Sequence, residues 1–307
     1  METKNIALVL SSGGARGLAH IGAIRALHEQ GYRITAVSGT SMGALVGAIL
    51  ANGKLPEFSD FITNLTRIDV IRLMDLAVSK QGIIKGERVF GEIKRFIGEG
   101  NIEDLPIPFA AVATDLFNHR EIIFRHGSLF SAVRASAAIP TVLLPLQYGN
   151  DCFVDGALVN PLPINRVSRS GNDRLVAVNV NAPRQPLHAK KETPSNSSYH
   201  KIREFVNQKW NGAMSGRKAA VPPIHGFFDI VSGSFEMMQH KLTEASLKEQ
   251  KPDLLINLPV NMADMLEFYK AKDIIETGYR ATLAGLRLPT AETNAGDESG
   301  LVREWII

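Results

Sequence analysis

Short apolar runs alternate with segments of helical spacing in the N-terminal part of the chain. Residues 6–10 form a continuous apolar run, and two serines and two glycines follow it directly. This pattern is typical of a buried strand that ends in a tight turn. Apolar residues then recur at three-residue steps up to Gly31, which stands in the usual stop position of a helix. Residues 34–38 repeat the strand pattern, and residues 44–51 form a second helix of small and apolar residues. The pattern therefore predicts two consecutive strand–turn–helix units.

The rest of the chain continues in the same way. Residues 58–73 have helical spacing with polar residues between, so this amphipathic segment is expected to form one or two helices. The other expected elements are helices at 87–97, 129–138, 227–247 and 262–286, strands at 109–114, 121–124, 175–180 and 254–256, and a hairpin of 142–146 with 153–154. Alternating strands and helices favour an α/β fold with a mostly parallel sheet, which binds ligands at the carboxyl ends of its strands.

Composition narrows the class of protein. The chain has 307 residues, 45% of them hydrophobic, which is enough for one large α/β domain. Its formal net charge is only +3, so a chain-wide field that would attract nucleic acid is not expected. The single cysteine, Cys152, cannot form an internal disulfide, and no stretch reaches the roughly 18 apolar residues of a membrane span. We expect a cytoplasmic protein that meets membranes only at their surface.

One stretch differs from the rest in composition. Residues 184–220 are rich in Pro, Ser, Asn, Lys and Arg and carry eight basic residues against two acidic ones, an excess of six positive charges. A polar stretch of this kind is usually a solvated insertion, because it cannot bury enough apolar surface to become ordered. The alternative is a flap that contacts an anionic membrane surface.

A Gly-x-Ser-x-Gly motif occupies residues 39–43, between the second predicted strand and the second predicted helix. Such a motif places the serine on a sharp strand-to-helix turn, where Gly39 and Gly43 leave room for a strained backbone and a close neighbouring chain. The N-terminus of the following helix favours negative charge beside the hydroxyl. The motif therefore predicts that Ser41 is the nucleophile of a serine hydrolase.

A second glycine-rich turn, residues 12–17, follows the first predicted strand and opens the first helix. Backbone N–H groups in such a turn converge where an oxyanion would develop, and Gly13 and Gly14 allow close approach of the main chain. A dinucleotide-binding turn is disfavoured, because position 12 is Ser and no acidic residue ends the second strand. Arg16 would either hold a substrate phosphate or clamp loop carbonyls.

The residues alone do not identify the base that activates Ser41. The order Ser41, Asp155, His225 matches an α/β-hydrolase triad, but that fold reaches its nucleophile only after several strands, whereas Ser41 follows the second. Asp155 lies at a predicted strand end, followed by Gly156. An aspartate at such a turn is usually an Asx-turn residue, so its position alone does not make it a base.

Three motifs taken in order change this assessment. The chain contains the glycine-rich turn 12–17, then the Ser41 motif 39–43, then Asp155 followed by Gly156 and Ala157. With the further segments 135–140 and 155–163, residues 5–182 resemble the patatin-like phospholipase family. The resemblance implies a three-layer α/β/α fold with a central, mostly parallel sheet. It also implies hydrolysis of acyl esters of phospholipids, lysophospholipids or related lipids, through an acyl-enzyme and without metal or cofactor.

The resemblance also implies roles for individual residues. Ser41 would be the nucleophile and Asp155 the base of a dyad without histidine. The N–H groups of Gly13, Gly14 and Ala15 would form the oxyanion hole. Ser12 departs from the first glycine that is common in the family, so an altered loop geometry is expected there.

Two other functions and a domain organisation complete the expectations. An acyltransferase on the same dyad and a non-catalytic regulatory adaptor with this fold are the alternatives to a hydrolase. The organisation expected is one patatin-like catalytic domain at 1–288, with core motifs at 5–182, a polar basic insertion at about 184–222, closing helices at 224–288 and a polar tail at 289–307. The expected partners are a lipid ester substrate and a membrane surface, with no nucleic acid.

Overall fold

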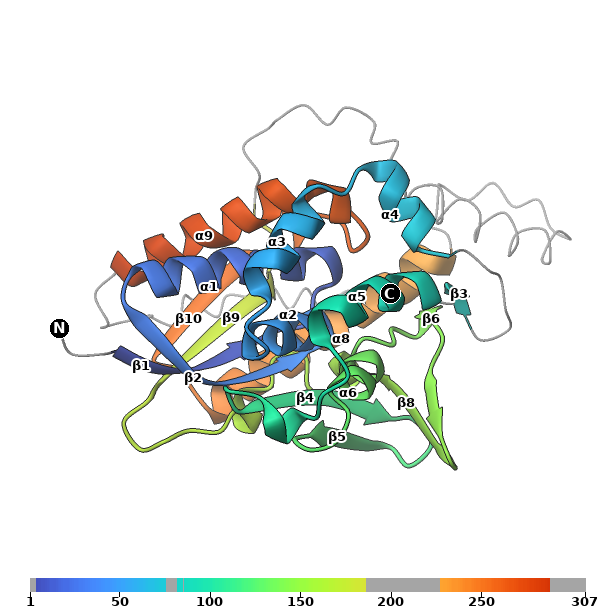
Figure 1. Cartoon of the computed structure of the whole chain (residues 1–307), viewed down its shortest axis with the longest axis horizontal. Helices are drawn as coiled ribbons and strands as arrows, with labels where there is room; N and C mark the ends of the chain where they lie inside the picture. The colour runs from blue at the N-terminus through green and yellow to red at the C-terminus, as the bar shows by residue number, and fades with distance from the viewer. Residues whose placement is uncertain (1–3, 76–81, 85, 186–226, 288–307) are drawn as a thin grey trace, which may run out of the picture.

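An eight-stranded sheet with helices on both faces forms the body of the molecule in the computed structural model (Figure 1). The structure describes residues 4–75, 82–84, 86–185 and 227–287. In sheet order the strands are β10 (Leu254–Pro259), β9 (Arg174–Ala182), β1 (Lys4–Leu10), β2 (Tyr32–Thr40), β4 (Phe109–Asp115), β8 (Asp151–Asp155) and β7 (Leu146–Tyr148), with β5 (Arg120–Phe124) also paired to β4. The first five are parallel, whereas β5 and β8 pair antiparallel with β4.

The alternating side chains of β1 show why helices cover both faces. Ile6, Leu8 and Leu10 belong to the large core formed with α1 (Ala19–Glu29), α2 (Met42–Ala51) and α9 (Ala271–Arg287). Ala7 and Val9 point the other way, into a smaller core that includes Leu247 of α8 (Phe227–Glu249). A strand that is buried on both faces requires an apolar residue at every position, and residues 6–10 meet this requirement. The expected three-layer α/β/α fold is confirmed.

The described residues contain four further helices, α3 (Leu55–Thr63), α4 (Arg67–Leu73), α5 (Glu87–Ile97) and α6 (Leu129–Ser136). Of these, α3, α5 and α6 contribute buried residues to the large core, whereas Val70 of α4 belongs to a smaller cluster. The amphipathic segment 58–73 thus forms two helices. They separate at Thr66, whose side chain accepts a hydrogen bond from the Asp69 N–H while the Asp69 carboxylate accepts from the Thr66 N–H, a capping box that begins α4.

The expected hairpin of 142–146 with 153–154 is only partly right. Residues of this run divide between β6 (Thr141–Leu143), which pairs in parallel with β3 (Gly82–Ile84), and β7, which forms the hairpin with β8. Pro145 separates the two short strands. Because proline has no N–H to donate, it interrupts a continuous strand at this point.

The expected helix at 262–286 begins too early, since α9 starts at Ala271. The preceding residues form two short 3₁₀ turns, Val260–Met262 and Phe268–Lys270, with irregular chain between. The Met265 carbonyl accepts a hydrogen bond from the Ala15 N–H at 2.8 Å. Backbone carbonyls committed to the glycine-rich turn are not available to continue a helix.

Some expectations lie wholly or partly outside the described residues. The basic stretch 184–220 is described only to residue 185, and the tail 289–307 lies outside, so the domain boundaries stay predictions. Within the described ranges, no helix combines the length and the hydropathy needed to cross a bilayer.

Candidate active site

Ser41 occupies a strained turn between β2 and α2. Its φ of 58° and ψ of −121° lie in a region that non-glycine residues rarely adopt. The neighbouring glycines are required by space: a Cβ at Gly43 would lie 2.3 Å from the Leu10 carbonyl oxygen, and one at Gly39 would lie 2.4 Å from the backbone of Gly43. The Gly-x-Ser-x-Gly spacing therefore corresponds to a turn packed tightly against β1.

A buried serine on α6 holds this turn in place. Ser136 is fully buried, and its Oγ accepts a hydrogen bond from the Ser41 N–H at 2.9 Å. The same Oγ donates to the Val112 carbonyl on β4 at 2.5 Å. Ser136 lies within 135–140, a segment that carries the family resemblance, but no role was expected for it. In the sequence, Ser136 stands out as a hydroxyl side chain among the small and apolar residues of a predicted helix. A hydroxyl group that is buried needs a hydrogen-bond partner.

Strand register brings Asp155 to Ser41. Thr40, the last residue of β2, pairs with Val112 of β4, and β4 continues beyond the end of β2. The antiparallel strand β8 returns along this extension until Asp155 pairs with Ala113. Ser41 and Asp155 thus meet at the same level of the sheet, and the Ser41 Oγ donates a hydrogen bond to Asp155 Oδ2 at 2.5 Å.

The Asp155 carboxyl group is almost completely removed from water. The residue is 1% exposed, and its Oδ1 accepts a hydrogen bond from the Ala157 N–H at 2.8 Å. Burial raises the pKa of Asp155 from its ordinary value near 3.8 to about 7, although the hydrogen bonds from Ser41 and Ala157 partly oppose this shift. Near neutral pH, this carboxyl group can therefore both accept and release a proton.

The glycine-rich turn lies beside Ser41, and two of its N–H groups have no hydrogen-bond partner among the described residues. Gly14 has a φ of +55°, and a Cβ there would lie 2.6 Å from the Met265 side chain. Within the part of the chain that the structure describes, the N–H groups of Gly13 and Gly14 make no hydrogen bond. The Ala15 N–H, in contrast, is donated to the Met265 carbonyl. It is not available to a ligand, contrary to the expectation for Ala15.

Ser12 and Arg16 anchor the ends of this turn. The Ser12 Oγ donates to Gln239 Oε1 of α8 at 2.6 Å, so the departure from the family's glycine adds a link to that helix. The guanidinium of Arg16, a residue only 6% exposed, donates to Asn181 Oδ1 at 3.0 Å and contacts the Ala263 carbonyl at 3.5 Å. Of the two interpretations of Arg16, these contacts favour the loop clamp.

No histidine among the described residues contacts the Ser41 hydroxyl. His20 is fully buried and its Nε2–H donates to the Ser11 carbonyl at 2.9 Å. Burial lowers the pKa of His20 to about 4, so its imidazole is neutral at pH 7. His225 lies outside the described residues, and His240 pairs with Glu244 on α8. The described residues likewise contain no group of three His, Cys, Asp or Glu side chains placed to hold a metal ion.

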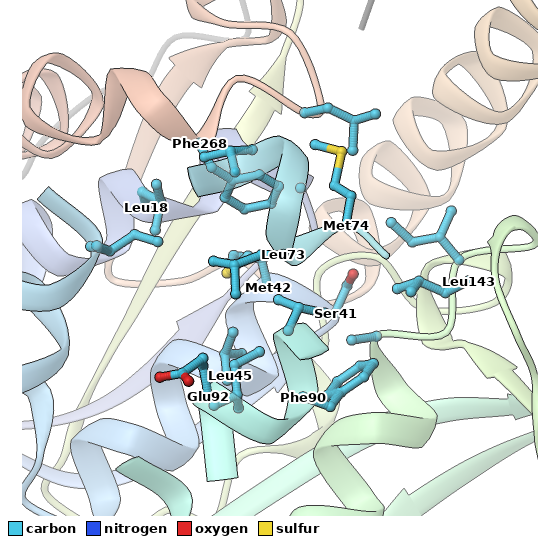
Figure 2. Close-up of a pocket in the computed structure, with 18 of the residues that line it drawn as sticks. Leu18, Ser41, Met42, Leu45, Leu73, Met74, Phe90, Glu92, Leu143 and Phe268 are labelled. Carbon is cyan, nitrogen blue, oxygen red and sulfur yellow. The ribbon is translucent and has the colours of Figure 1, made fainter. Parts of the chain in front are cut away.

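An apolar cavity of about 140 Å³ opens at Ser41. Figure 2 shows Ser41 beside Met42, Leu73 and Phe90, with Glu92 as the acidic side chain among the residues labelled there. The cavity is enclosed by α2, α3, α4, α5, α6 and the segment 265–268. A space lined in this way favours an apolar ligand over ordered water.

Comparison with known proteins identifies the family to which this site belongs. Residues 8–167 match the family model described as patatin-like phospholipase. This chain belongs to the patatin-like phospholipase family. The matched segment contains both the Ser41 turn and Asp155 and places the chain among lipid hydrolases in general.

Individual relatives agree with this family. An uncharacterised NTE family protein of Mycobacterium tuberculosis is 31% identical in an alignment of 325 positions that covers 90% of this chain and 90% of the relative. Lysophospholipase NTE1 of Pyricularia oryzae is 28% identical over 293 residues, which cover 92% of this chain and 18% of that protein. Among solved structures, VipD from Legionella pneumophila matches with a TM-score of 0.45 and 14% identity, covering 93% of this chain and 67% of that one.

Replacing Ser136 tests whether it holds the serine turn. Ser136→Ala leaves the buried Ser41 N–H and one hydrogen bond of the Val112 carbonyl without a partner, so we expect unfolding free energy to fall by about 1–3 kcal/mol. Ser131→Ala, an exposed position on the same helix, is the control and is expected to change it by less than about 0.5 kcal/mol. Equal unfolding midpoints for both variants in urea would contradict the role of Ser136.

Proposed function

We propose that this protein is a serine lipid acyl hydrolase in which Ser41 is the nucleophile and Asp155 the catalytic base. The observation that carries the proposal is the 2.5 Å hydrogen bond from the Ser41 Oγ, on a strained turn, to a buried carboxyl group with a pKa near neutrality. Family membership supports lipid hydrolysis in general. The apolar cavity at Ser41 supports an acyl chain as the part of the substrate that is bound.

In the first step, an acyl-enzyme forms. Asp155 Oδ2 takes the proton of the Ser41 hydroxyl as its Oγ attacks the ester carbonyl carbon. The negative charge that develops on the carbonyl oxygen is stabilised by the N–H groups of Gly13 and Gly14, which have no hydrogen-bond partner in the described part of the chain. The ester C–O bond then breaks, and the proton held by Asp155 passes to the departing alkoxide, which leaves as an alcohol.

In the second step, water removes the acyl group. Asp155, now ionised again, takes a proton from a water molecule, whose oxygen attacks the carbonyl carbon of the acyl-enzyme. The bond between that carbon and Ser41 Oγ breaks, and the proton returns from Asp155 to the serine. The products are a fatty acid and the free enzyme. The carboxyl group of Asp155 thus carries out all the proton transfers of both steps.

The named relatives guide the choice of substrate. The Pyricularia oryzae protein is called a lysophospholipase. We therefore take lysophospholipids and phospholipids as the substrates to test first. An acyltransferase would use the same acyl-enzyme but pass the acyl group to an alcohol or a thiol, so analysis of products with an added acceptor separates the two reactions.

The dyad is tested by fatty-acid release from lysophosphatidylcholine and from p-nitrophenyl butyrate. We expect Ser41→Ala and Asp155→Asn each to lower kcat by about 10³-fold or more, since each removes a group needed in both steps. The matched controls are Ser131→Ala and Asp151→Asn, which change an exposed serine and a partly exposed aspartate of β8 and should retain near wild-type rates. Equal rates for the dyad variants and wild type would contradict the proposal, and a wild type that hydrolyses neither substrate would favour an adaptor.

We also propose that α4 contacts a lipid surface. Val70 and Met74 line the cavity on the inner side, whereas Ile68 on the outer side is 60% exposed and Ile71 is 38% exposed. Arg67 is on the same helix, where a positive charge is attracted to anionic lipid headgroups. A helix with one face on the cavity and the other on the membrane would bring the substrate's chain directly to Ser41.

Vesicle co-sedimentation tests this contact. Ile68→Glu is expected to weaken binding to phosphatidylglycerol-containing vesicles about tenfold, because it places a negative charge on the apolar outer face, while hydrolysis of p-nitrophenyl butyrate is unchanged. Phe117→Glu serves as the control, because Phe117 is 65% exposed in the turn between β4 and β5. Figure 1 shows the labels of these two strands at the opposite side of the molecule from α4. Equal binding by both variants would exclude α4 as the contact.

A further inference from the structure

A second apolar groove lies next to the cavity at Ser41. It has a volume of about 300 Å³ and, like the cavity, is dominated by apolar side chains, but it carries no charged residue. Its lining consists of Ile139, Pro140, Val142, Leu158, Val231, Ser232, Ser234, Phe235, Met238 and Met265. Of these, Ile139, Val142 and Met265 also line the cavity. The two spaces are therefore neighbours that share a wall of three apolar side chains.

The groove adjoins the same elements that hold the dyad. Leu158 ends the 3₁₀ turn Gly156–Leu158 that directly follows Asp155. Met265 lies against Gly14 and accepts the hydrogen bond of the Ala15 N–H. The groove thus adjoins the turn that follows Asp155, through Leu158, and the segment that packs against the glycine-rich turn, through Met265.

One face of α8 forms the opposite wall. Val231, Phe235 and Met238 recur at a spacing of four and three residues, which places them on the same side of the helix. Val231 and Met238 each remain 36% exposed in this position. Apolar side chains that line an open groove beside a cavity leave surface that an apolar ligand would remove from water.

We propose that this groove binds the second acyl chain of a two-chain glycerolipid, while the chain to be cleaved lies in the cavity at Ser41. The proposal rests on the proposed function and extends it from acyl esters in general to diacyl lipids. The two ester groups of such a lipid are carried by neighbouring carbons of one glycerol unit, so its two acyl chains start close together. They can therefore enter two spaces that are separated by a single layer of side chains. The wall of Ile139, Val142 and Met265 meets this requirement.

The chemistry of the groove favours an acyl chain over the polar parts of the same lipid. A phosphate headgroup is bound by basic side chains or by exposed N–H groups, and the groove lining contains no basic residue. Its position directly beside the cavity, across a shared wall, favours a ligand that is covalently joined to the chain at Ser41. A single-chain lysolipid fills the cavity alone and leaves the groove empty.

Two neighbouring methionines of α8 provide a matched test. Met238 lines the groove, whereas Met237 is 69% exposed and does not line it. The variants Met238→Glu and Met237→Glu are compared with wild type on dioctanoylphosphatidylcholine and on 1-octanoyl-lysophosphatidylcholine, which share a headgroup and an acyl chain length. Met238→Leu keeps an apolar side chain of similar size and serves as the conservative variant.

The expected result is a selective loss. Met238→Glu should lower kcat/KM for the two-chain substrate about tenfold or more and leave that for the one-chain substrate within about twofold, because only the former needs an apolar groove. Met237→Glu and Met238→Leu should resemble wild type on both substrates.

Other results would overturn the inference. Equal losses on both substrates, or equal effects of the two glutamate variants, would show that the groove does not hold a second chain. Failure of the groove proposal and failure of the dyad proposal are distinguishable. If wild type hydrolyses the one-chain substrate and Ser41→Ala does not, the dyad is supported, even where the Met238 variants show that the groove binds no second chain. If wild type cleaves neither lipid, the groove proposal falls, and the dyad is then judged by whether hydrolysis of p-nitrophenyl butyrate is lost in Ser41→Ala.

Discussion

The burial of one carboxyl group constrains the whole site. Asp155 is 1% exposed and has only the Ser41 hydroxyl and the Ala157 N–H, among the described residues, as hydrogen-bond donors to its side-chain oxygens. Ionisation in such a place is unfavourable, so the pKa rises to about 7 and the group becomes a base suited to neutral pH. The same burial requires β8 to end at one level of the sheet, the level at which β2 ends and the Ser41 turn begins.

Local sequence patterns predicted the elements around Ser41 because those patterns reflect local geometry. The apolar run at 34–38, the glycines at 39 and 43 and the small residues at 44–51 specify a strand, a tight turn and a helix with little help from the rest of the chain. Asp155 could not be assigned to Ser41 in that way, since the two residues are 114 positions apart in the sequence. Their contact depends on the register of β4 with two different strands, and only the resemblance to a family supplied it.

The features missed from sequence share a physical cause. The engaged N–H of Ala15 and the irregular chain at Met265, which lies before the start of α9, meet in one tertiary hydrogen bond from Ala15 to the Met265 carbonyl. Helical spacing cannot reveal where a backbone carbonyl finds its partner. The role of Ser136 was missed for the same reason, because its two partners lie on β4 and at the start of α2.

The cavity and the groove show how one segment contributes to several parts of the site. Residues near Met265 position the glycine-rich turn, close the cavity and separate it from the groove under α8. In the proposed enzyme the dyad determines the reaction, whereas this segment, together with α4 and α8, determines which lipid reaches it.

The role of Asp155 as the base predicts a specific pH dependence for Ser41 acylation in single turnover, followed as release of p-nitrophenol from p-nitrophenyl butyrate. The rate should rise about tenfold per pH unit below an apparent pKa of about 7 and level off above it. The midpoint should also change little with temperature, because a carboxyl group ionises with little enthalpy change, whereas an imidazole midpoint falls on warming. A rate independent of pH from about 5 to 9, or a midpoint that falls on warming as an imidazole's does, would exclude Asp155 as the base.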